Sequence, residues 1–481
     1  MIASIRLILP EIFLSGSALF LLGWDAFIQE HLKKWVFWMS FFALAITFFL
    51  LIHPPQEGVA FGMLVQDPFS LFFKVLALFS AGFILLISRE DKALMGDYAG
   101  TYVSLILFSV VGTMFLSSAK DLLMLFLGME LTTIPLFILA GFLRNDLRSS
   151  EGAIKFFLVG TLSTGLMLFG ISYLYGLTGS TQFKEIYEWF NKTQLGNGDL
   201  VLFFLAILFL LAGLGFKLSL VPFHQWTPDT YEGAPTPITA FFSVSREAGV
   251  IVVTVRLFSE YLKQNQMGMT SFFALLSILT MTIGNIAALR QNNLKRLLAY
   301  SSIAHAGTIF IGLVAGNRLG REGIMLYSLA YFLMSLGAFS VVIYVSRLKN
   351  SEDISSIQGL SKENFPLSLM MLFFLLSLSG IPPFLGFWAK FYVFWAAIEA
   401  KLFYLVAIAL LNAIIAVYYY FRIVHKMFFQ EPSYSQPLSS RLERHYGLEF
   451  ATLLAVSLLL LFGIFPQSLL SWIKGSSVII P

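Results

Sequence analysis

Long apolar stretches alternate with short polar connections along the whole of this 481-residue chain. About fourteen of the stretches approach the ~20 residues that a helix needs to cross a bilayer. They lie near residues 3–23, 35–53, 66–88, 98–117, 121–143, 152–176, 200–222, 238–260, 271–290, 297–316, 322–346, 367–398, 401–425 and 448–473. No connection between them is long enough for a separate soluble domain. The pattern predicts an all-α polytopic membrane protein.

The composition agrees with a lipid bilayer as the surroundings. Hydrophobic residues make up 58% of the chain and charged residues 12%, against about 25% charged residues in a soluble domain. The net charge of +4 arises from cations between apolar runs rather than in patches, so no nucleic-acid partner is expected. The absence of cysteine excludes disulfides, thiol catalysis and cysteine-ligated metals. The first apolar run has no small-residue cleavage site after it, and we expect it to be retained as a helix.

One stretch, residues 213–247, departs from the apolar pattern. Lys217 stands alone in an apolar run that Pro222 then interrupts. A lysine within a membrane-grade segment is costly and marks an ion or proton pathway by default. Proline removes a backbone donor and frees the carbonyl of Leu218, and such irregular backbone is tolerated only in buried or water-lined places. The stretch therefore favours a transport function.

The positions of the interruptions predict an internal repeat. Segments four to eight and nine to thirteen overlay as two five-helix units, in which the seventh and twelfth segments are proline-broken and contain Lys217 and Lys390. An odd number of helices makes successive units inverted, and paired broken helices in inverted repeats indicate a transport site. The expected parts are N-terminal helices at 1–97, a first repeat at 98–260, a second, inverted repeat at 261–425, and a loop with the last helix at 426–481.

A buried carboxylate accompanies the first lysine. Glu130 precedes Pro135 by five residues, the same spacing as Lys217 before Pro222. Two interpretations are open. Glu130 and Lys217 form an ion pair that tunes a proton-carrying lysine, or they form a static pair that fixes helix packing.

Two further ionisable residues lie in later segments. Lys390 follows the Gly380-Ile381-Pro382-Pro383 break, and apolar residues continue after it, which disfavours snorkelling to the surface. His305 lies in a polar patch of the tenth segment. It is either a satisfied core residue or a proton relay, for which its near-neutral ordinary pKa is suited.

Other polar residues fit structural roles. Lys74 lies seven residues after Asp67, and Arg256 lies near the end of its segment; we expect both cations to be structural. The trio His224, Asp229 and Glu232 is better explained as a polar turn at the cytoplasmic mouth than as a metal site.

The distribution of cations predicts the orientation. One set of alternating loops contains 17 Lys and Arg, whereas the other set, with both termini, contains 9. By the positive-inside rule, both termini lie on the outer, periplasmic side of the membrane.

These motifs resemble a known family. The run FKLSLVPFHQWTPDTYEGAPTP at 216–237 resembles the antiporter-like N subunit of respiratory complex I, the proton-pumping NADH:quinone oxidoreductase, within the Mrp-antiporter-like superfamily. The Gly-Met-Glu that ends at Glu130, the run LAYSSIAH at 298–305 and the break at 380–383 extend the resemblance over nearly the whole chain.

The resemblance implies a role within a larger complex. In the family the matching glutamate pairs with the broken-helix lysine, and a polar axis leads to the second broken helix, which gives roles to Glu130, Lys217, His305 and Lys390. It implies other membrane-arm subunits as partners, including other antiporter-like ones, and the cell inner (plasma) membrane as the location. This chain is expected to hold no cofactor, since flavin, iron–sulfur clusters and the NADH site belong to other subunits.

One position departs from the family. The eighth segment usually has lysine where this chain, counted from the Pro-Thr-Pro motif at 235–237, has Glu247 beside Arg246. Either Glu247 is itself a titrating relay, or Arg246 supplies a fixed cation that Glu247 neutralises. Neighbouring residues point about 100° apart on a helix and do not pair automatically.

Three function classes remain open. The first is a proton-translocating subunit of NADH:quinone oxidoreductase with no redox chemistry of its own. The second is a stand-alone or Mrp-type secondary cation/proton antiporter subunit, and the third is a non-conducting assembly scaffold. The quinone type, the choice between H⁺ and Na⁺, the host compartment and the parent redox complex are left open by the sequence.

Overall fold

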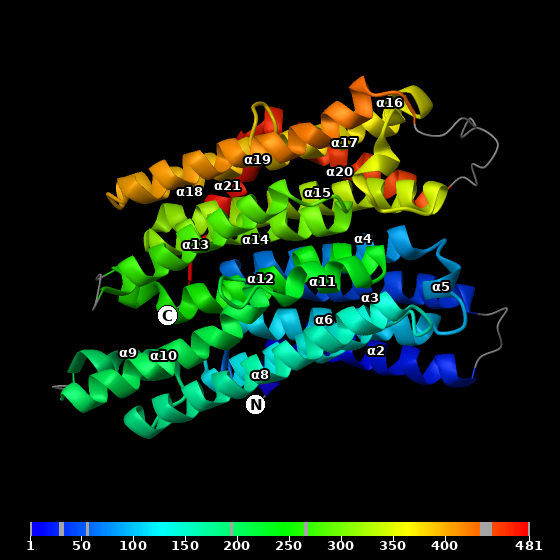
Figure 1. Ribbon diagram of the computed structural model, residues 1–481. Helices are drawn as coiled ribbons and strands as arrows, with labels where there is room; N and C mark the ends of the chain where they lie inside the picture. Colours follow the sequence, from blue (N-terminus) through cyan, green and yellow to red (C-terminus); the bar gives the residue numbers. More distant parts are fainter. Residues whose placement is uncertain are drawn as a thin grey trace.

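The computed structural model describes residues 2–27, 33–53, 57–192, 196–263, 268–432 and 445–479, without the side chains of residues 34, 197, 245–247 and 263. The described part is an elongated array of long helices that lie roughly side by side (Figure 1). The helices of the first predicted repeat lie toward one end of the array, and those of the second lie toward the other.

The expected apolar segments are helices. Twelve helices in the described ranges are long and apolar enough to cross a membrane. They are α3 (Lys34–Ile52), α4 (Pro68–Ser88), α6 (Ala99–Ser118), α7 (Leu122–Ala140), α8 (Leu147–Thr178), α10 (Asn197–Leu218), α12 (Thr236–Lys263), α13 (Met269–Leu289), α14 (Leu294–Val314), α15 (Arg318–Lys349), α19 (Phe403–Phe429) and α20 (Tyr446–Ile464). The two remaining segments coincide with α2 (Leu9–Phe27) and with the broken pair α17 (Phe365–Ser379) and α18 (Leu385–Glu399). The predicted all-α membrane architecture is confirmed.

Short elements complete the fold. They are α1 (Ile2–Leu7), α5 (Lys92–Met95), α9 (Phe183–Lys192), α11 (Trp226–Gly233), the 3₁₀ turn η3 (Ile354–Ile357), α16 (Leu360–Glu363) and α21 (Pro466–Ser476). A hairpin of β1 (Gly58–Ala60) and β2 (Leu64–Gln66), which the sequence analysis did not predict, lies between α3 and α4. The segment expected at 448–473 is two helices, because Pro466 begins α21 and cannot continue the hydrogen bonding of α20.

Two matching backbone arrangements support the predicted repeat. The long helices α8 and α15 each contain 32 residues. Before α7, Asp121 forms an isolated antiparallel bridge with Gln182, and before α14, Asn293 forms the same kind of bridge with Asp353. Asp121 and Asn293 also cap the helices that follow them. The exact limits of the repeat, and its inversion, remain predictions.

The first break follows α10. The helix ends at Leu218, and Ser219 adopts a left-handed conformation with φ of 56°. The Leu220 N–H then donates to the Gly215 carbonyl at 2.8 Å, a bond that satisfies one of the last helical carbonyls. The Val221–Pro222 peptide bond is cis. The helix is therefore already closed three residues before the proline that the sequence analysis took as the interruption.

The second break repeats this geometry after α17. Gly380 has φ of 83°, and the Ile381 N–H donates to the Leu376 carbonyl at 3.1 Å. The Pro382–Pro383 peptide bond is cis. Both breaks thus place a left-handed residue three positions before a proline, which gives the two broken helices one common backbone design.

The last helix of the first predicted repeat is buried and contacts both repeats. Helix α12 packs against α6 and α10 of the first repeat and against α14 and α15 of the second. The described side chains of its most apolar window are all buried within the protein. This position places α12 in contact with helices of both halves.

The loops predicted to be cytoplasmic meet at one end of the array. Arg347 Nη2 lies 3.2 Å from Asp91 Oδ2, and Lys295 Nζ lies 2.9 Å from Glu352 Oε1. These contacts join loops that are far apart in the sequence, as alternating loops on one membrane face require. Which face of the membrane they occupy remains a prediction.

Candidate functional site

The first broken helix holds Lys217 against the helix that contains Glu130. Lys217 lies one residue before the end of α10, and its side chain is 0% exposed. Its Nζ donates a hydrogen bond to Thr133 Oγ1 of α7. Thr133 lies one helical turn after Glu130, whose Oε1 accepts a hydrogen bond from Thr164 Oγ1 of α8 at 2.8 Å. The structure thus brings Lys217 to the region of Glu130, while their ion pair remains a prediction.

Aromatic side chains surround this break. The indole N–H of Trp226 donates to the Phe216 carbonyl at 3.1 Å, which satisfies a backbone group beside Lys217. Trp226 stacks on Phe156 of α8 with ring centroids 4.2 Å apart, and it is 1% exposed. Because these rings fill the space beside the opened backbone, the break is enclosed by protein, as an irregular segment at membrane depth requires.

The second broken helix holds Lys390 on backbone carbonyls. From α18, Lys390 Nζ donates to the carbonyls of Leu378 and Ser379 at 3.0 and 2.9 Å. These carbonyls belong to the last turn of α17, where a helix leaves acceptors without an intrahelical partner. The carboxyl end of a helix also carries a partial negative charge that favours a cation. The side chain of the lysine therefore lies at the break itself.

His305 is connected to two tyrosines. Its Nδ1 lies 2.7 Å from Tyr327 Oη of α15, and its Nε2 lies 3.1 Å from Tyr420 Oη of α19. Tyr420 also forms a hydrogen bond with Ser301, one turn before the histidine. A neutral imidazole donates from one nitrogen and accepts at the other, so both positions are satisfied. The contacts fit a core histidine and a relay equally well, and both interpretations stay open.

His305 and Lys390 line one small cavity. The cavity has a volume of about 20 Å³, room for about one water molecule. Asn285 and Asn412 also line it, with Asn285 Nδ2 donating to Asn412 Oδ1 at 3.1 Å. Tyr419 Oη donates to Asn285 Oδ1 at 3.1 Å. Neither asparagine was predicted as a site residue, although an amide within an apolar helix is a signal that can identify both.

The two lysines face corresponding positions of the two halves. Thr133, which contacts Lys217, lies twelve residues after the α7 cap Asp121. His305, which shares a cavity with Lys390, lies twelve residues after the α14 cap Asn293. In each half, the lysine of the broken helix therefore lies near the position twelve residues after the cap of the second helix, which is α7 in the first half and α14 in the second.

Arg246 and Glu247, the positions at which the sequence differs from the family pattern, belong to α12. The backbone at residues 245–247 belongs to this helix, but the side chains of Arg246 and Glu247 lie outside the described residues. One turn earlier, Ser243 Oγ lies 2.7 Å from Ser335 Oγ of α15. Both arrangements of Glu247 and Arg246 remain predictions.

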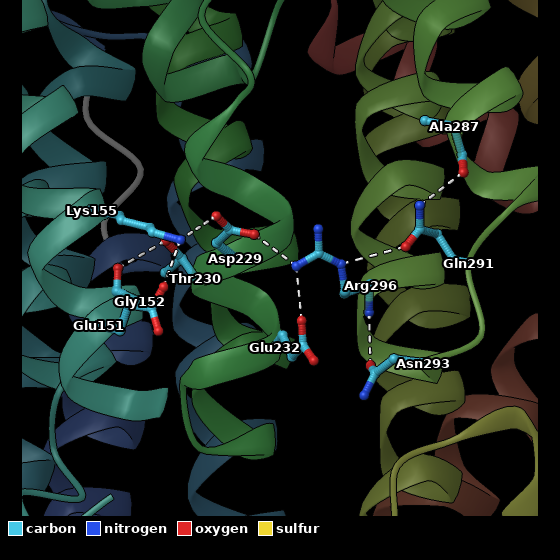
Figure 2. Close-up of polar contacts among 10 residues, drawn as sticks. All are labelled: Glu151, Gly152, Lys155, Asp229, Thr230, Glu232, Ala287, Gln291, Asn293 and Arg296. Atoms are coloured by element: carbon cyan, nitrogen blue, oxygen red, sulfur yellow. Dashed lines mark hydrogen bonds and ion pairs between the residues drawn. The ribbon is translucent and has the colours of Figure 1, made fainter. Parts of the chain in front are cut away.

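The residues expected to form a polar turn instead lie on and next to a short helix. Asp229 and Glu232 belong to α11, where Arg296 Nη1 lies 2.7 Å from Asp229 and 2.8 Å from Glu232 (Figure 2). Lys155 Nζ lies 2.8 Å from the other oxygen of Asp229. The cluster joins α8 and α14 through α11, across the two halves. Among the described residues, no group of three or more His, Cys, Asp or Glu could hold a metal ion.

The two basic partners determine the ionisation of Asp229. Burial alone would raise the pKa of its carboxyl, but hydrogen bonds and charges from Lys155 and Arg296 outweigh burial and lower this pKa below its ordinary value. The carboxylate is therefore charged at neutral pH, and the cluster is a set of ion pairs rather than neutral hydrogen bonds.

Lys74 and Arg256 are each paired with a carboxylate. Lys74 Nζ lies 2.6 Å from Glu11 Oε1, and both side chains are buried. Arg256 Nη2 lies 2.6 Å from Asp67 Oδ1. Both cations were expected to be structural. Asp67 was considered as the ion-pair partner of Lys74, but in the structure it pairs with Arg256. Sequence spacing alone did not identify Glu11, because it comes from a different helix.

Comparison with known proteins identifies similar chains. Residues 119–416 match the sequence profile of the family described as "NADH:quinone oxidoreductase/Mrp antiporter, TM". NADH-quinone oxidoreductase subunit N of Anaeromyxobacter sp. is 38% identical in an alignment of 452 positions that covers 89% of this chain and 87% of that protein. The subunit N of Pelagibacter ubique is 37% identical in an alignment of 484 positions, gaps included, that covers 99% of this chain and 100% of that protein.

Solved structures share the fold. A chain of respiratory complex I from Thermus thermophilus with bound aureothin has a TM-score of 0.80 and 30% identity, covering 96% of this chain and 98% of that chain. A chain of the Mrp complex from Dietzia sp. has a TM-score of 0.81 at 17% identity, covering 99% of this chain and 97% of that one. The second likeness concerns the fold alone.

Proposed function

Because the chain belongs to the NADH:quinone oxidoreductase/Mrp antiporter family, we propose that it is a proton-translocating membrane-arm subunit of an NADH:quinone oxidoreductase. The names of its relatives and the fold shared with a chain of complex I support this proposal. The partners are the other membrane-arm subunits, including other antiporter-like ones, and the redox cofactors lie in partner subunits. The bacterial relatives favour the plasma membrane, with both termini on the outer side.

One observation carries the proposal. A buried or partly buried lysine lies at each of two helix breaks that share one backbone design, and each approaches the same level of the second helix in its half. Ionisable residues within membrane segments are retained where they serve a pathway. A structural pair at one break would not require a second lysine at the other.

The proposed path runs along the array. A proton is held near Glu130 and Lys217, passes α12 at Glu247, and reaches Lys390 by way of His305. In a low-dielectric interior, the charge on one group raises the cost of a like charge nearby, so the protonation states of successive groups are coupled. Moving one charge against 100 mV costs about 2.3 kcal/mol.

Lys217 gives the main test. Lys217→Ala should abolish redox-linked proton pumping, and Glu130→Gln should depress it strongly, with pumping normalised to assembled complex. Lys192→Ala is the matched control, because Lys192 lies on α9, is 74% exposed and, among the described residues, forms its ion pair with the neighbouring Glu188. Normal pumping by the Lys217→Ala complex would overturn the proposal.

The roles of Glu247 and Arg246 on α12 are tested with a separate pair of variants. If Glu247 is a relay, Glu247→Gln impairs pumping while Arg246→Gln has a mild effect. If Arg246 is a fixed cation, Arg246→Gln leaves an uncompensated carboxylate and poor assembly. We favour the relay, because Glu247 occupies the position where relatives place a protonatable lysine. An unaffected Glu247→Gln complex rules the relay out.

Two experiments separate the other function classes. A stand-alone cation/proton antiporter would exchange ions when the purified chain alone is placed in liposomes. A non-conducting scaffold would tolerate loss of both Lys217 and Lys390 while the complex assembled and pumped normally. Co-purification in mild detergent identifies which membrane-arm subunits surround the chain.

A further inference from the structure

A pocket with basic and aromatic walls opens where α3 begins and α4 ends. It has a volume of about 580 Å³, and its lining includes Lys33, Trp35, Trp38, Arg89 and Asp97. The two indole side chains are 52% and 54% exposed. Tryptophan concentrates at the boundary between hydrocarbon and water. The pocket therefore lies at the level of lipid headgroups.

Arg89 is positioned in this pocket with its donors available. Its guanidinium lies over the Phe37 ring at 5.0 Å and over the Trp38 ring at 5.3 Å. Within the described ranges of the chain, no hydrogen bond or ion pair uses its nitrogens, although a guanidinium has five N–H donors that suit phosphate oxygens. Its neighbour Glu90 faces other partners, with Oε1 accepting from the Gly447 N–H at 3.0 Å.

Lys33 supplies a second cation. Its ammonium group donates one hydrogen bond to the backbone carbonyl of Asp97, which also lines the pocket. This bond fixes the lysine at the pocket and leaves further donors. The carboxylate of Asp97 also lines the pocket, so its described lining has two cations and one anion. The net positive charge of these three side chains favours a ligand group with one negative charge.

An apolar groove begins one helical turn below the pocket. It has a volume of about 470 Å³ and lies between α3, α4, α15 and α20. Its lining includes Phe41, one turn after the Phe37 that supports Arg89, and Leu86, one turn before Arg89. Gly82 forms part of the floor, where an added Cβ would lie 3.9 Å from the nearest atom, on Phe41.

The groove has the depth of one membrane leaflet. Phe79 lies ten residues before Arg89 on α4, about 15 Å along a helix. This is about half of the ~30 Å hydrocarbon core. At Phe79 the groove meets a second one of about 380 Å³, which reaches Trp472 on α21. The apolar surface thus continues from the headgroup level to the membrane centre and beyond.

We propose that this combined site binds an anionic diacyl phospholipid. Its phosphate lies between Arg89 and Lys33, its glycerol region lies beside the two tryptophans, and one acyl chain lies along Gly82 to Phe79. An apolar transmembrane helix of a partner would leave the two cations without a counter-charge, and a soluble anion has no use for the groove. Basic pockets between transmembrane helices bind anionic headgroups on the cytoplasmic side, and Lys33 and Arg89 belong to the loops predicted to face it.

The test measures lipid retention on the intact complex. Purified, delipidated complex is incubated with phosphatidylglycerol or with phosphatidylcholine of the same acyl chains, and retained lipids are counted by native mass spectrometry. We expect the unmodified complex to retain phosphatidylglycerol at least tenfold more tightly than phosphatidylcholine. Arg89→Gln should lose one such lipid per complex. Equal retention of both lipids, or an unchanged count in Arg89→Gln, would overturn the proposal.

Three further arms separate the chemistry. Gly82→Leu fills the groove without touching the cations and should also lose the lipid; unchanged retention would contradict the acyl-chain position. Lys362→Gln removes a cation of the same predicted face that already pairs with Glu431. It should retain the lipid, and an equal loss would mean diffuse surface charge instead of a site. Displacement of the lipid by inorganic phosphate alone would likewise refute a lipid site.

Discussion

The buried pair of Glu11 and Lys74 gives the sharpest prediction about which charges are structural. At 2.6 Å, with side chains 1% and 2% exposed, the gross attraction is about 6 kcal/mol at an effective dielectric constant of ~20. Desolvation of each ion costs several kcal/mol, so the pair as a whole is nearly neutral. Removing one partner is different, because it leaves an enclosed, uncompensated charge at a cost of about 3–5 kcal/mol.

Lys74→Met should therefore lower the thermal stability of the purified complex strongly, and Glu11→Gln combined with Lys74→Met should restore most of it. Thermal melts followed by size-exclusion chromatography of the two single variants and the double variant give the interaction term of the cycle. Pumping per assembled complex should stay at the unmodified level in the double variant. A Lys74→Met complex as stable as the unmodified one, or a double variant as unstable as Lys74→Met, would refute the reasoning.

Three further predictions follow from the breaks and the ion cluster. Lys390→Arg should only partly support pumping, because arginine hardly deprotonates, and full pumping by this variant would show that titration there is unnecessary. Gly380→Ala places a Cβ 2.7 Å from Lys390 Cδ at a left-handed φ and should cost about 1–2 kcal/mol in unfolding experiments. Ser219→Gly at the matching position relieves the left-handed conformation but removes the buried hydrogen bond to Thr227 Oγ1, so the two effects oppose each other and the net change should be smaller. Because the folded pKa of Asp229 is depressed, its stabilisation is present above an unfolded pKa of about 3.9 and is lost as pH falls through the folded value. Melting temperatures measured against pH should show this acid-side loss in the unmodified chain and not in Asp229→Asn.

The membrane fold could be predicted because its signals are local. A run of about 20 apolar residues identifies a spanning helix by itself, and the prolines near both breaks marked the interruptions. What ends α10 is less visible in the sequence. Ser219 adopts a left-handed conformation that serine seldom takes, and no local pattern indicates it. The three-residue strands at 58–66 are likewise too short to give a detectable alternation.

The candidate site was only partly predictable, because its contacts are long-range. Lys217 and Lys390 were identified from the cost of burying a charge in an apolar run, which is a property of the sequence. The tyrosines around His305 were not, since Tyr420 is 115 residues away along the chain and resembles any interfacial tyrosine. The ion cluster at Asp229 was missed for the same reason: its partners come from α8 and α14, and only the packed fold brings them together.

The position of Lys390 on the open end of α17 has a consequence for how the site can change. Its acceptors are peptide carbonyls, which do not titrate and which no side-chain substitution removes. A carboxylate partner would switch off when protonated, whereas these oxygens attract the ammonium equally in acid and in alkali. The response of the second break to pH therefore comes from the lysine's own proton and its neighbours. This cation site therefore depends on the backbone turn at Gly380 rather than on the identity of the surrounding side chains.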